Sequence, residues 1–512
     1  MVRHLLPRPD SVLCAALAAD LDAADLRSEP LRTAWGAEAD DALARGVRSP
    51  LLAAIEGRTD ALATLGRLFV LGMPQPEADV AAALARTGVD GLETLGLGYR
   101  DDGVVVPAAL IRPQSFVDAD GVGEWWIASD LDELALHHMD GGGALPPDHV
   151  LGVGGASRTL ASLVMPLEVE RALDLGTGCG IQALLVSRHA GSVVATDISA
   201  RALAYAELNA MLAGVHNIEF RQGSMFEPVA DESFGLIVSN PPFVITPRGA
   251  DVPEYEYRDG GLVGDALVEA FVAQAPAHLV PGGSAQLLGN WESIGSLLGL
   301  RRLESWIAPD LDAWVVQRET LSPLGYAELW IRDGGTTPRD AAFEPLLDAW
   351  LADFAVRGVT EIGFGYVLIR RPAGVDSGAP ANPLRRFETL TQPVTSAGRA
   401  FRDGLVGHDA LADGVPEVLL VAPDVTEARH HLPGQEAPSV IELRQGGGFG
   451  RTVSVDPALA GFVGACDGDL TVVQIVSALA DLFEVPLADL WADLEPRLRV
   501  LVTDGFLIPA EH

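Results

Sequence analysis

The stretch Phe234-Gly-Leu-Ile-Val-Ser-Asn-Pro-Pro-Phe243 decides the fold of this chain. Its apolar first half predicts a buried strand, and the Pro-Pro pair must end that strand because proline has no N–H to donate to a neighbouring strand. We therefore expect the Asn240 amide, two carbonyl groups and the Phe243 ring at the carboxyl edge of a sheet. In open α/β sheets, ligands bind at that edge.

The region around this stretch alternates strand and helix patterns, which is typical of a parallel sheet covered by helices. Apolar runs predict seven strands, at residues 171–175, 192–197, 218–222, 236–240, 283–289, 313–318 and 363–369. Helices are expected at residues 182–189, 200–213, 266–279, 293–304 and 341–354. The fold class is therefore α/β, with a Rossmann-like seven-stranded core.

The length of 512 residues favours two to four domains. Residues 1–110 read as mostly helical and end in a hairpin whose turn is Asp102-Gly103, which predicts a winged-helix-like domain suited to docking a protein. We expect linker strands and an entry loop over 111–150 and the α/β core over 151–372. A Gly- and Pro-rich linker then leads to a C-terminal α+β domain over 373–512, again winged-helix-like.

Charge and composition restrict the class of partner. The chain has 71 acidic and 35 basic residues, a net charge of −36, which disfavours a nucleic-acid partner because phosphate binding usually needs a basic surface. The three cysteines are far apart and predict neither disulfides nor a metal site. No apolar run predicts a signal peptide or a membrane span, so we expect no membrane partner and a cytoplasmic location.

A glycine-rich turn, Asp174-Leu-Gly-Thr-Gly-Cys-Gly180, follows the first core strand and opens a helix. The glycines let a ligand approach the backbone, and the helix N-terminus favours negative groups. Its Gly-x-Gly-x-Gly spacing differs from the Gly-x-Gly-x-x-Gly of dinucleotide sites. Asp174, two positions ahead of the first glycine, would repel a pyrophosphate but can receive an ammonium group, so the turn favours S-adenosylmethionine over NAD.

Two further strand ends complete a cofactor site. Asp197, before Ile198 at the end of the second strand, can accept hydrogen bonds from both ribose hydroxyls. The third strand leads into Ser224 and Met225, a small polar and a flexible apolar residue that could contact an adenine ring.

These elements, in this order and closed by Asn-Pro-Pro-Phe, resemble the class I S-adenosylmethionine-dependent methyltransferases. Within that class the chain is similar to release-factor glutamine methyltransferases and, nearly as closely, to small-domain ribosomal RNA guanine methyltransferases. The resemblance covers roughly residues 150–290. It implies a cofactor site made of Asp174, Gly176, Thr177, Gly178, Gly180, Asp197, Ile198, Ser224, Met225 and Asn240. It also implies a catalytic acceptor site made of Asn240, Pro241, Pro242 and Phe243. Ser224 departs from the family, since many relatives have Asp there.

The chemistry of the acceptor stretch predicts an N-methyltransferase. Planar amides and exocyclic amines attack poorly because their nitrogen lone pair is delocalised. If the Asn240 side-chain oxygen and the Pro241 carbonyl each accept one N–H, the nitrogen is held with its lone pair aimed at the sulfonium methyl. The sequence thus predicts an S-adenosylmethionine-dependent enzyme that methylates a planar nitrogen in a protein or peptide. The alternatives are an RNA or DNA exocyclic-amine methyltransferase and a natural-product N-methyltransferase.

Two loops are further candidates. Tyr255 and Tyr257, in the polar loop after the acceptor stretch, are expected to cover the substrate, although a plain surface connection fits the sequence equally well. Residues 152–158, Gly-Val-Gly-Gly-Ala-Ser-Arg, lie where relatives close over the cofactor.

Overall fold

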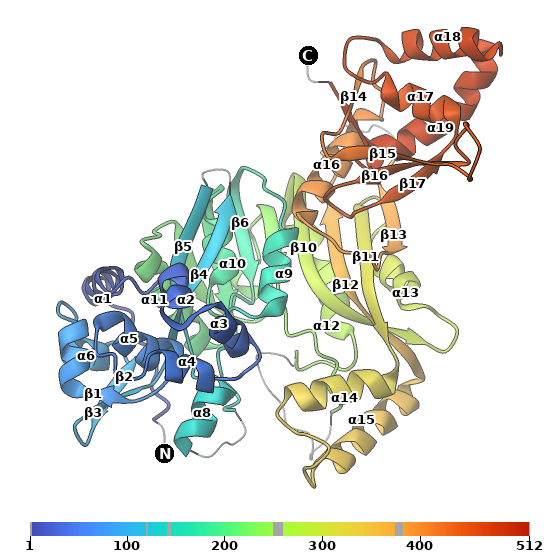
Figure 1. The fold of residues 1–512 in the computed structure, drawn as a ribbon. Coiled ribbons are helices and arrows are strands. Elements are labelled where there is room, and N and C mark those ends of the chain that lie inside the picture. The colour runs from blue at the N-terminus through green and yellow to red at the C-terminus, as the bar shows by residue number, and fades with distance from the viewer. Residues whose placement is uncertain (1–2, 119–120, 141–144, 249–259, 374–381, 511–512) are drawn as a thin grey trace. The chain divides into compact units, whose positions relative to one another are not determined.

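The computed structural model describes residues 3–118, 121–140, 145–248, 260–373 and 382–510 (Figure 1). The chain divides into two compact units. The first unit comprises Met1–Leu160, Glu168–Ala308 and Thr320–Arg371, and the second comprises Ala161–Leu167, Pro309–Glu319 and Pro372–His512. The four-part division predicted from the sequence stays a prediction.

The first unit begins with short helices and a small sheet. The helices are α1 (Ser11–Ala23), α2 (Ser28–Trp35), α3 (Ala37–Ala44), α4 (Ser49–Ala54), α5 (Ala61–Leu65), the π-helix η1 (Gly66–Val70), α6 (Glu77–Ala83) and α7 (Gly88–Thr94). The strands β1 (Gln75–Pro76), β2 (Gly98–Asp101) and β3 (Val104–Pro107) pair in the order β1-β3-β2. The predicted hairpin is confirmed, with its turn at Asp102-Gly103. The winged-helix assignment stays a prediction.

The linker region is a long antiparallel hairpin followed by two helices. Its elements are β4 (Leu110–Asp118), β5 (Gly121–Ser129), α8 (Glu133–Asp140) and α9 (Gly155–Leu163). Helix α9, which overlaps the 152–158 candidate, was not predicted from the sequence.

The core sheet of the first unit has the strand order β12-β10-β9-β6-β7-β8. Its strands are β6 (Val169–Leu175), β7 (Ala190–Asp197), β8 (Ile218–Gln222), β9 (Phe234–Ser239), β10 (Leu279–Ile294) and β12 (Val359–Arg370). The first four pair in parallel, β10 pairs in parallel with β9, and β12 is antiparallel to β10. A mixed α/β fold with a large central sheet is confirmed.

The first unit has further helices after β6, and several of them pack on the core sheet. They are α10 (Ile181–Val186), α11 (Ala200–Ala213), the short η2 (Glu227–Val229), α12 (Ala266–Gln274), η3 (Ala275–His278), α13 (Gly299–Trp306), α14 (Pro323–Asp333) and α15 (Phe343–Arg357). Helices α10 and α11 contact β6, β7 and β8, whereas α12 and α13 contact β10. The prediction for α11 matches at both ends. The helix predicted over 293–304 is wrong in its first part, because β10 continues to Ile294 and α13 begins only at Gly299.

The second unit contains residues 312–319 of β11 (Asp312–Leu321), and Ala313–Gln317 of this strand pair in parallel with β13 (Arg385–Thr389). Its other elements are α16 (Ala397–Ala410), β14 (Leu419–Val421), β15 (Val425–His430), β16 (Val440–Gln445), β17 (Thr452–Val455), α17 (Pro457–Gly464), α18 (Val472–Phe483), α19 (Leu487–Thr503) and β18 (Leu507–Pro509). Its winged-helix character also stays a prediction.

Candidate active site

The glycine-rich turn between β6 and α10 is fixed on one side and open on the other. Gly178 and Gly180 both have positive φ angles, +55° and +86°. A Cβ atom at Gly180 would lie 3.0 Å from the Cα and Cβ atoms of Ala206 on α11, whereas one at Gly176 or Gly178 would meet nothing within 4 Å. The turn therefore packs tightly against α11 and presents bare backbone to the side where a ligand would lie.

Asp174 lies beneath this turn and is fully buried. Its Oδ2 accepts hydrogen bonds from Thr177 Oγ1 (2.6 Å) and from the Ala183 backbone N–H (2.9 Å). Its Oδ1 is enclosed and has no hydrogen-bond partner among the described residues. Burial raises the pKa of Asp174 to about 7, and the two hydrogen bonds oppose the rise. The carboxyl group thus ties the turn to the start of α10, and its predicted contact with a cofactor stays a prediction.

Asp197, at the carboxyl end of β7, is hydrogen-bonded both to the glycine-rich turn and to the segments that follow β7 and β8. Its Oδ2 accepts from the Gly178 N–H (2.9 Å) and its Oδ1 from the Ser199 N–H (2.9 Å). Its backbone carbonyl accepts from the Gly223 N–H (3.0 Å), just ahead of Ser224. Burial raises its pKa. Each carboxylate oxygen keeps a lone pair for a further donor, so the position suits a ligand hydroxyl.

The acceptor stretch follows β9, as predicted. Ser239 Oγ donates to the Leu175 carbonyl (2.7 Å), which aligns the end of β9 with the start of the glycine-rich turn. Asn240 is half-buried, and its Oδ1 is enclosed without a hydrogen-bond partner among the described residues. Buried polar atoms are nearly always hydrogen-bonded, so this lone acceptor marks a place where a ligand N–H can bind.

Helix α14 supplies acceptor-side residues that the sequence analysis missed. The Tyr326 hydroxyl oxygen accepts from the Ile245 N–H (3.0 Å) and from Asn290 Nδ2 (2.6 Å), which fixes the helix beside the acceptor stretch. One turn later, Trp330 meets the Phe243 ring edge-on, with centroids 6.4 Å apart. Ser322, which caps the helix, and Pro323 at its first position are a start signal from which α14 could have been found.

The glycine-rich turn, the end of β7, the acceptor stretch and Trp330 line one cavity of about 850 Å³ in the first unit. Its size lies within the range of small-molecule sites. The predicted residues that line it are Gly176, Thr177, Gly178, Asp197, Ile198, Ser224, Met225, Asn240, Pro241, Pro242 and Phe243. Asp174 and Gly180 are not part of the lining, and Tyr255 and Tyr257 lie outside the described residues. Residues not predicted include His149, Gln182, Arg248, Trp330 and Asp333.

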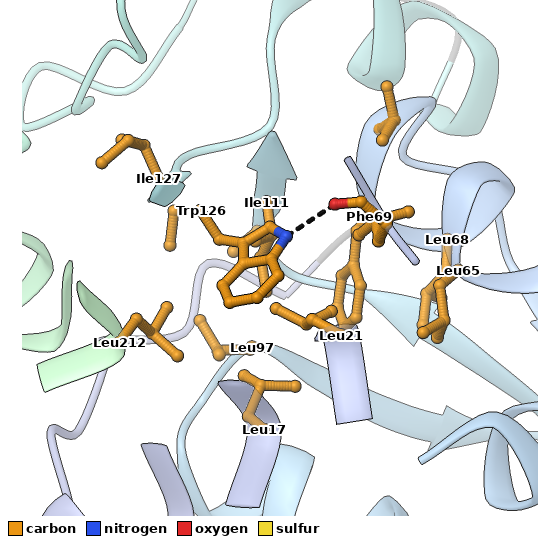
Figure 2. Packing of buried hydrophobic residues seen from close by; sticks show 14 of the residues in the cluster. Leu17, Leu21, Leu65, Leu68, Phe69, Leu97, Ile111, Trp126, Ile127 and Leu212 are labelled. Carbon is orange, nitrogen blue, oxygen red and sulfur yellow. Dashed lines mark hydrogen bonds between the residues drawn. The ribbon is translucent and has the colours of Figure 1, made fainter. Parts of the chain in front are cut away.

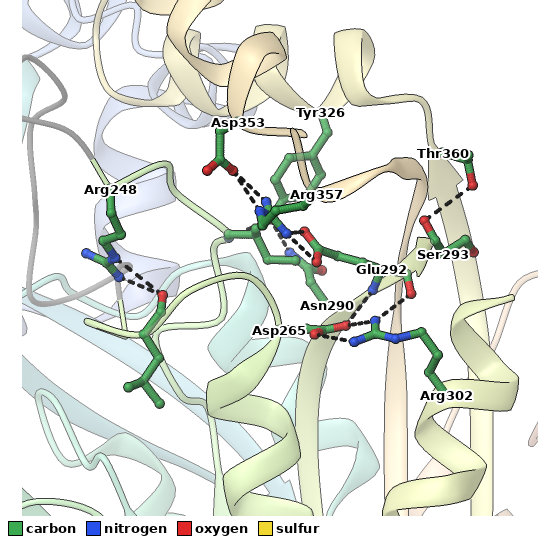
Figure 3. A network of polar contacts seen from close by, with 12 residues as sticks. Arg248, Asp265, Asn290, Glu292, Ser293, Arg302, Tyr326, Asp353, Arg357 and Thr360 are labelled. Carbon is green, nitrogen blue, oxygen red and sulfur yellow. Dashed lines mark hydrogen bonds and ion pairs between the residues drawn. The ribbon is translucent and has the colours of Figure 1, made fainter. Parts of the chain in front are cut away.

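Figure 3 shows a network of ionic and polar contacts around Glu292. Glu292 on β10 is 1% exposed, and both of its carboxylate oxygens accept from Arg357 Nη1 at 2.5 Å. Its backbone N–H donates to Asp265 (2.8 Å), whose carboxylate also binds Arg302. Burial raises the pKa of Glu292, and Arg357 opposes the rise. The network anchors the start of α12, so it holds the cavity-lining Leu267 in place.

The chemistry of the lining fits S-adenosylmethionine. The backbone at Gly176 and Gly178 is open to a ligand, Asp197 offers carboxylate oxygens to hydroxyl donors, and the Met225 side chain offers an apolar surface. Among the described residues, no group of three or more His, Cys, Asp or Glu side chains could hold a metal ion. No described helix is long and apolar enough to cross a membrane. The fold and this cavity define a class I methyltransferase.

Comparisons with known proteins agree with this class. Residues 152–295 match the methyltransferase small domain family, and residues 23–109 match a domain of unknown function, DUF7059. The release factor glutamine methyltransferase of Deinococcus radiodurans is 31% identical over 268 residues, 48% of this chain and 91% of that protein. The ribosomal protein uL3 glutamine methyltransferase of Bradyrhizobium diazoefficiens is 30% identical over 247 residues, 45% of this chain and 73% of that protein.

A solved structure is also similar in part. The 16S rRNA N2 G1207 methyltransferase of T. Thermophilus, in complex with AdoMet and guanosine, is 19% identical and is aligned over 45% of this chain and 57% of that chain, with a TM-score of 0.26. A score this low says nothing about function. The chain spans about half the length, 48%, of the Xylella fastidiosa release factor glutamine methyltransferases that it matches. The chain belongs to the methyltransferase family that contains the release factor and ribosomal protein uL3 glutamine methyltransferases.

Proposed function

We propose that this chain transfers a methyl group from S-adenosylmethionine to the side-chain amide nitrogen of a glutamine in a protein. The observation that carries the proposal is the enclosed Oδ1 of Asn240 at the cavity, which has no hydrogen-bond partner in the part of the chain that the structure describes. An amide NH₂ group has two N–H donors, one for Asn240 Oδ1 and one for the neighbouring Pro241 carbonyl. The names of the relatives point to the same acceptor.

S-adenosylmethionine, when bound, supplies an electrophilic sulfonium methyl group. Asn240 Oδ1 and the Pro241 carbonyl each accept one N–H of the substrate amide, which turns the nitrogen lone pair toward that methyl. As the N–CH₃ bond forms, the S–CH₃ bond breaks, and the nitrogen then releases one proton to water. The Phe243 ring, held against Phe364 at 5.7 Å and Trp330, supplies an apolar face for the planar amide.

Charge favours a protein acceptor over RNA. Among the described residues that line the cavity, one is an arginine, Arg248, and it donates to the Leu262 carbonyl at 3.0 Å (Figure 3). Asp197 and Asp333 also line the cavity, and the whole chain carries −36. A phosphate backbone would meet more negative than positive charge there. The proposal includes the cytoplasmic location predicted from the sequence.

The test is a labelling experiment with two variants. The purified full chain is incubated with methyl-labelled S-adenosylmethionine and separated protein and RNA fractions of a cell lysate, and labelled protein is digested and searched for N5-methylglutamine. Asn240→Ala should lose labelling and keep cofactor affinity. Asn217→Ala is the matched control, because Asn217 Nδ2 donates to the Ser187 and Ala190 carbonyls and Asn217 does not line the cavity among the described residues. Label confined to the RNA fraction would refute the proposal.

A further inference from the structure

The N-terminal region, which is residues 3–130 with the gap at 119–120, shares one hydrophobic core with the helices of the methyltransferase domain. Buried side chains from both parts belong to a single cluster, which includes Leu17 and Leu21 of α1, Trp126 of β5, and Leu208 and Leu212 of α11. Figure 2 shows Trp126 among these residues, with its Nε1 donating to the Leu26 carbonyl at 2.6 Å. The N-terminal region is thus packed directly on the helix that supports the glycine-rich turn.

Asn209 of α11 connects this region to the turn itself. It is fully buried, and its side chain makes a two-way pair with the backbone of Ala128 in β5: Oδ1 accepts from the N–H (2.7 Å) and Nδ2 donates to the carbonyl (2.9 Å). The second N–H of Nδ2 donates to the Cys179 carbonyl of the turn (2.8 Å). The Asn209 side chain therefore connects the end of β5 to the glycine-rich turn.

Asp130, which directly follows β5, makes a second connection to α11. It is 4% exposed and accepts from Arg201 Nε (2.8 Å) and the Tyr205 hydroxyl (2.9 Å), both on α11. It also accepts from the Val150 N–H (2.9 Å) and donates its own N–H to the Val150 carbonyl (3.1 Å). Burial alone would raise the pKa of Asp130, but Arg201 holds it below its ordinary value, so the carboxylate is charged.

Val150 lies near the start of the segment that forms one wall of the cavity. His149, Val150, Leu151, Gly152 and residues 154–157 all line it. The far end of the segment is tied as well, because Gln182 Nε2 donates to the Ser157 carbonyl at 2.7 Å. The cofactor wall, residues 149–157, is therefore held at one end by α10 and at the other by Asp130.

We propose that the function of the N-terminal region, which includes the domain of unknown function, is to hold the cofactor wall and the glycine-rich turn in their binding positions, with Asp130 and Asn209 as positioning residues. Neither side chain lines the cavity. The effect is indirect: the region orders the wall before the ligand arrives, so less ordering free energy is lost on binding. The inference relies on the proposed function only for the identity of the ligand.

The test measures S-adenosylmethionine affinity by calorimetry on the full chain. Asp130→Asn keeps the size of the side chain but removes the negative charge that pairs with Arg201 and replaces one of the two acceptor oxygens by an NH₂ donor, and we expect about tenfold weaker binding. The matched control is Asp20→Asn. Asp20 is 1% exposed and accepts from Thr87 N (2.8 Å) and Thr87 Oγ1 (2.9 Å), all within the N-terminal region. It should lower stability and leave affinity within about twofold of wild type.

A second readout separates positioning from general loosening. Backbone hydrogen exchange over residues 149–157 of the ligand-free chain should speed up in Asp130→Asn and stay unchanged in Asp20→Asn. If Asp130→Asn does not fold, Tyr205→Phe, which removes one of the hydrogen bonds to Asp130, should weaken binding about threefold. Wild-type affinity in folded Asp130→Asn, or equal weakening in Asp20→Asn, would overturn the inference. No binding by the wild-type chain would instead refute the proposed cofactor.

Discussion

Replacing Gly180 by alanine should destabilise the fold, whereas the same change at Gly178 should chiefly impair cofactor binding. A Cβ at Gly180 would lie 3.0 Å from two atoms of Ala206, one of them backbone, and the φ of +86° is unfavourable for any side chain. A left-handed conformation costs ~1–2 kcal/mol and overpacking ~1–3 kcal/mol. The free energy of unfolding should therefore fall by roughly 2–5 kcal/mol in Gly180→Ala.

Gly178→Ala isolates the other effect. Its φ of +55° carries the conformational cost of ~1–2 kcal/mol, but the new methyl would meet no protein atom within 4 Å. Since Gly178 lines the cavity, the methyl would occupy ligand space. Urea unfolding followed by circular dichroism and calorimetry with S-adenosylmethionine should give opposite rankings of the two variants. If Gly180→Ala proves no less stable than Gly178→Ala, or Gly178→Ala binds as wild type does, the reasoning is refuted.

Three further outcomes are expected. Burial holds the pKa of Asp174 at about 7 against an ordinary 3.8, so the folded chain binds this proton more tightly than the unfolded chain. Its contribution to stability therefore falls as pH rises from about 4 to about 7, and urea midpoints of Asp174→Asn across that range should lack this fall. Asn240→Ala should lower kcat by at least about 100-fold and leave cofactor affinity unchanged by calorimetry; unchanged turnover would refute its role. Trp330→Ala should raise KM for the protein acceptor about tenfold, and an effect on cofactor affinity alone would contradict its position beside Phe243.

The parts of the site that sequence reasoning located are those built from local backbone. The turn at 174–180 and the acceptor stretch each depend on a few adjacent residues whose conformational limits are known, and the cavity brings most of them together. Helix α11 has the bounds that were predicted, and its ends are set by local signals, since Ser199 caps its start and Gly214 its end. Local signals of this kind need no knowledge of distant contacts.

The errors arose where distant contacts decide the structure. Polar residues such as Asn290 and Glu292 read as the end of a strand, yet β10 continues through them because Tyr326 and Arg357 provide buried partners. Arg357 is 65 positions from Glu292 in the sequence. A buried carboxylate is unfavourable unless paired, so no single-sequence pattern could have placed it in a central strand.

Pro496 is a second case in which distant contacts override a local signal, because a proline normally ends a helix. Helix α19 runs through it, from Leu487 to Thr503. Leucines on both sides of the proline, Leu490, Leu494, Leu498 and Leu501, bury one continuous stripe in the core of the second unit. A proline inside a helix removes one hydrogen bond and costs ~3 kcal/mol, and burial of a leucine side chain is worth ~1.5–3 kcal/mol. Four such side chains outweigh the break.

The difference between the segment that matches the methyltransferase family and the elements outside it also concerns substrate choice. The match to the methyltransferase small domain ends at residue 295, whereas Tyr326 and Trp330, which complete the acceptor side, lie beyond it on α14. The cofactor wall likewise begins before residue 152, where Asp130 holds it. The segment shared with the family thus contains the glycine-rich turn and the acceptor stretch, whereas elements on either side of it also line the cavity where the ligands would bind. We therefore expect acceptor specificity to change with α14 and cofactor affinity to change with the N-terminal region.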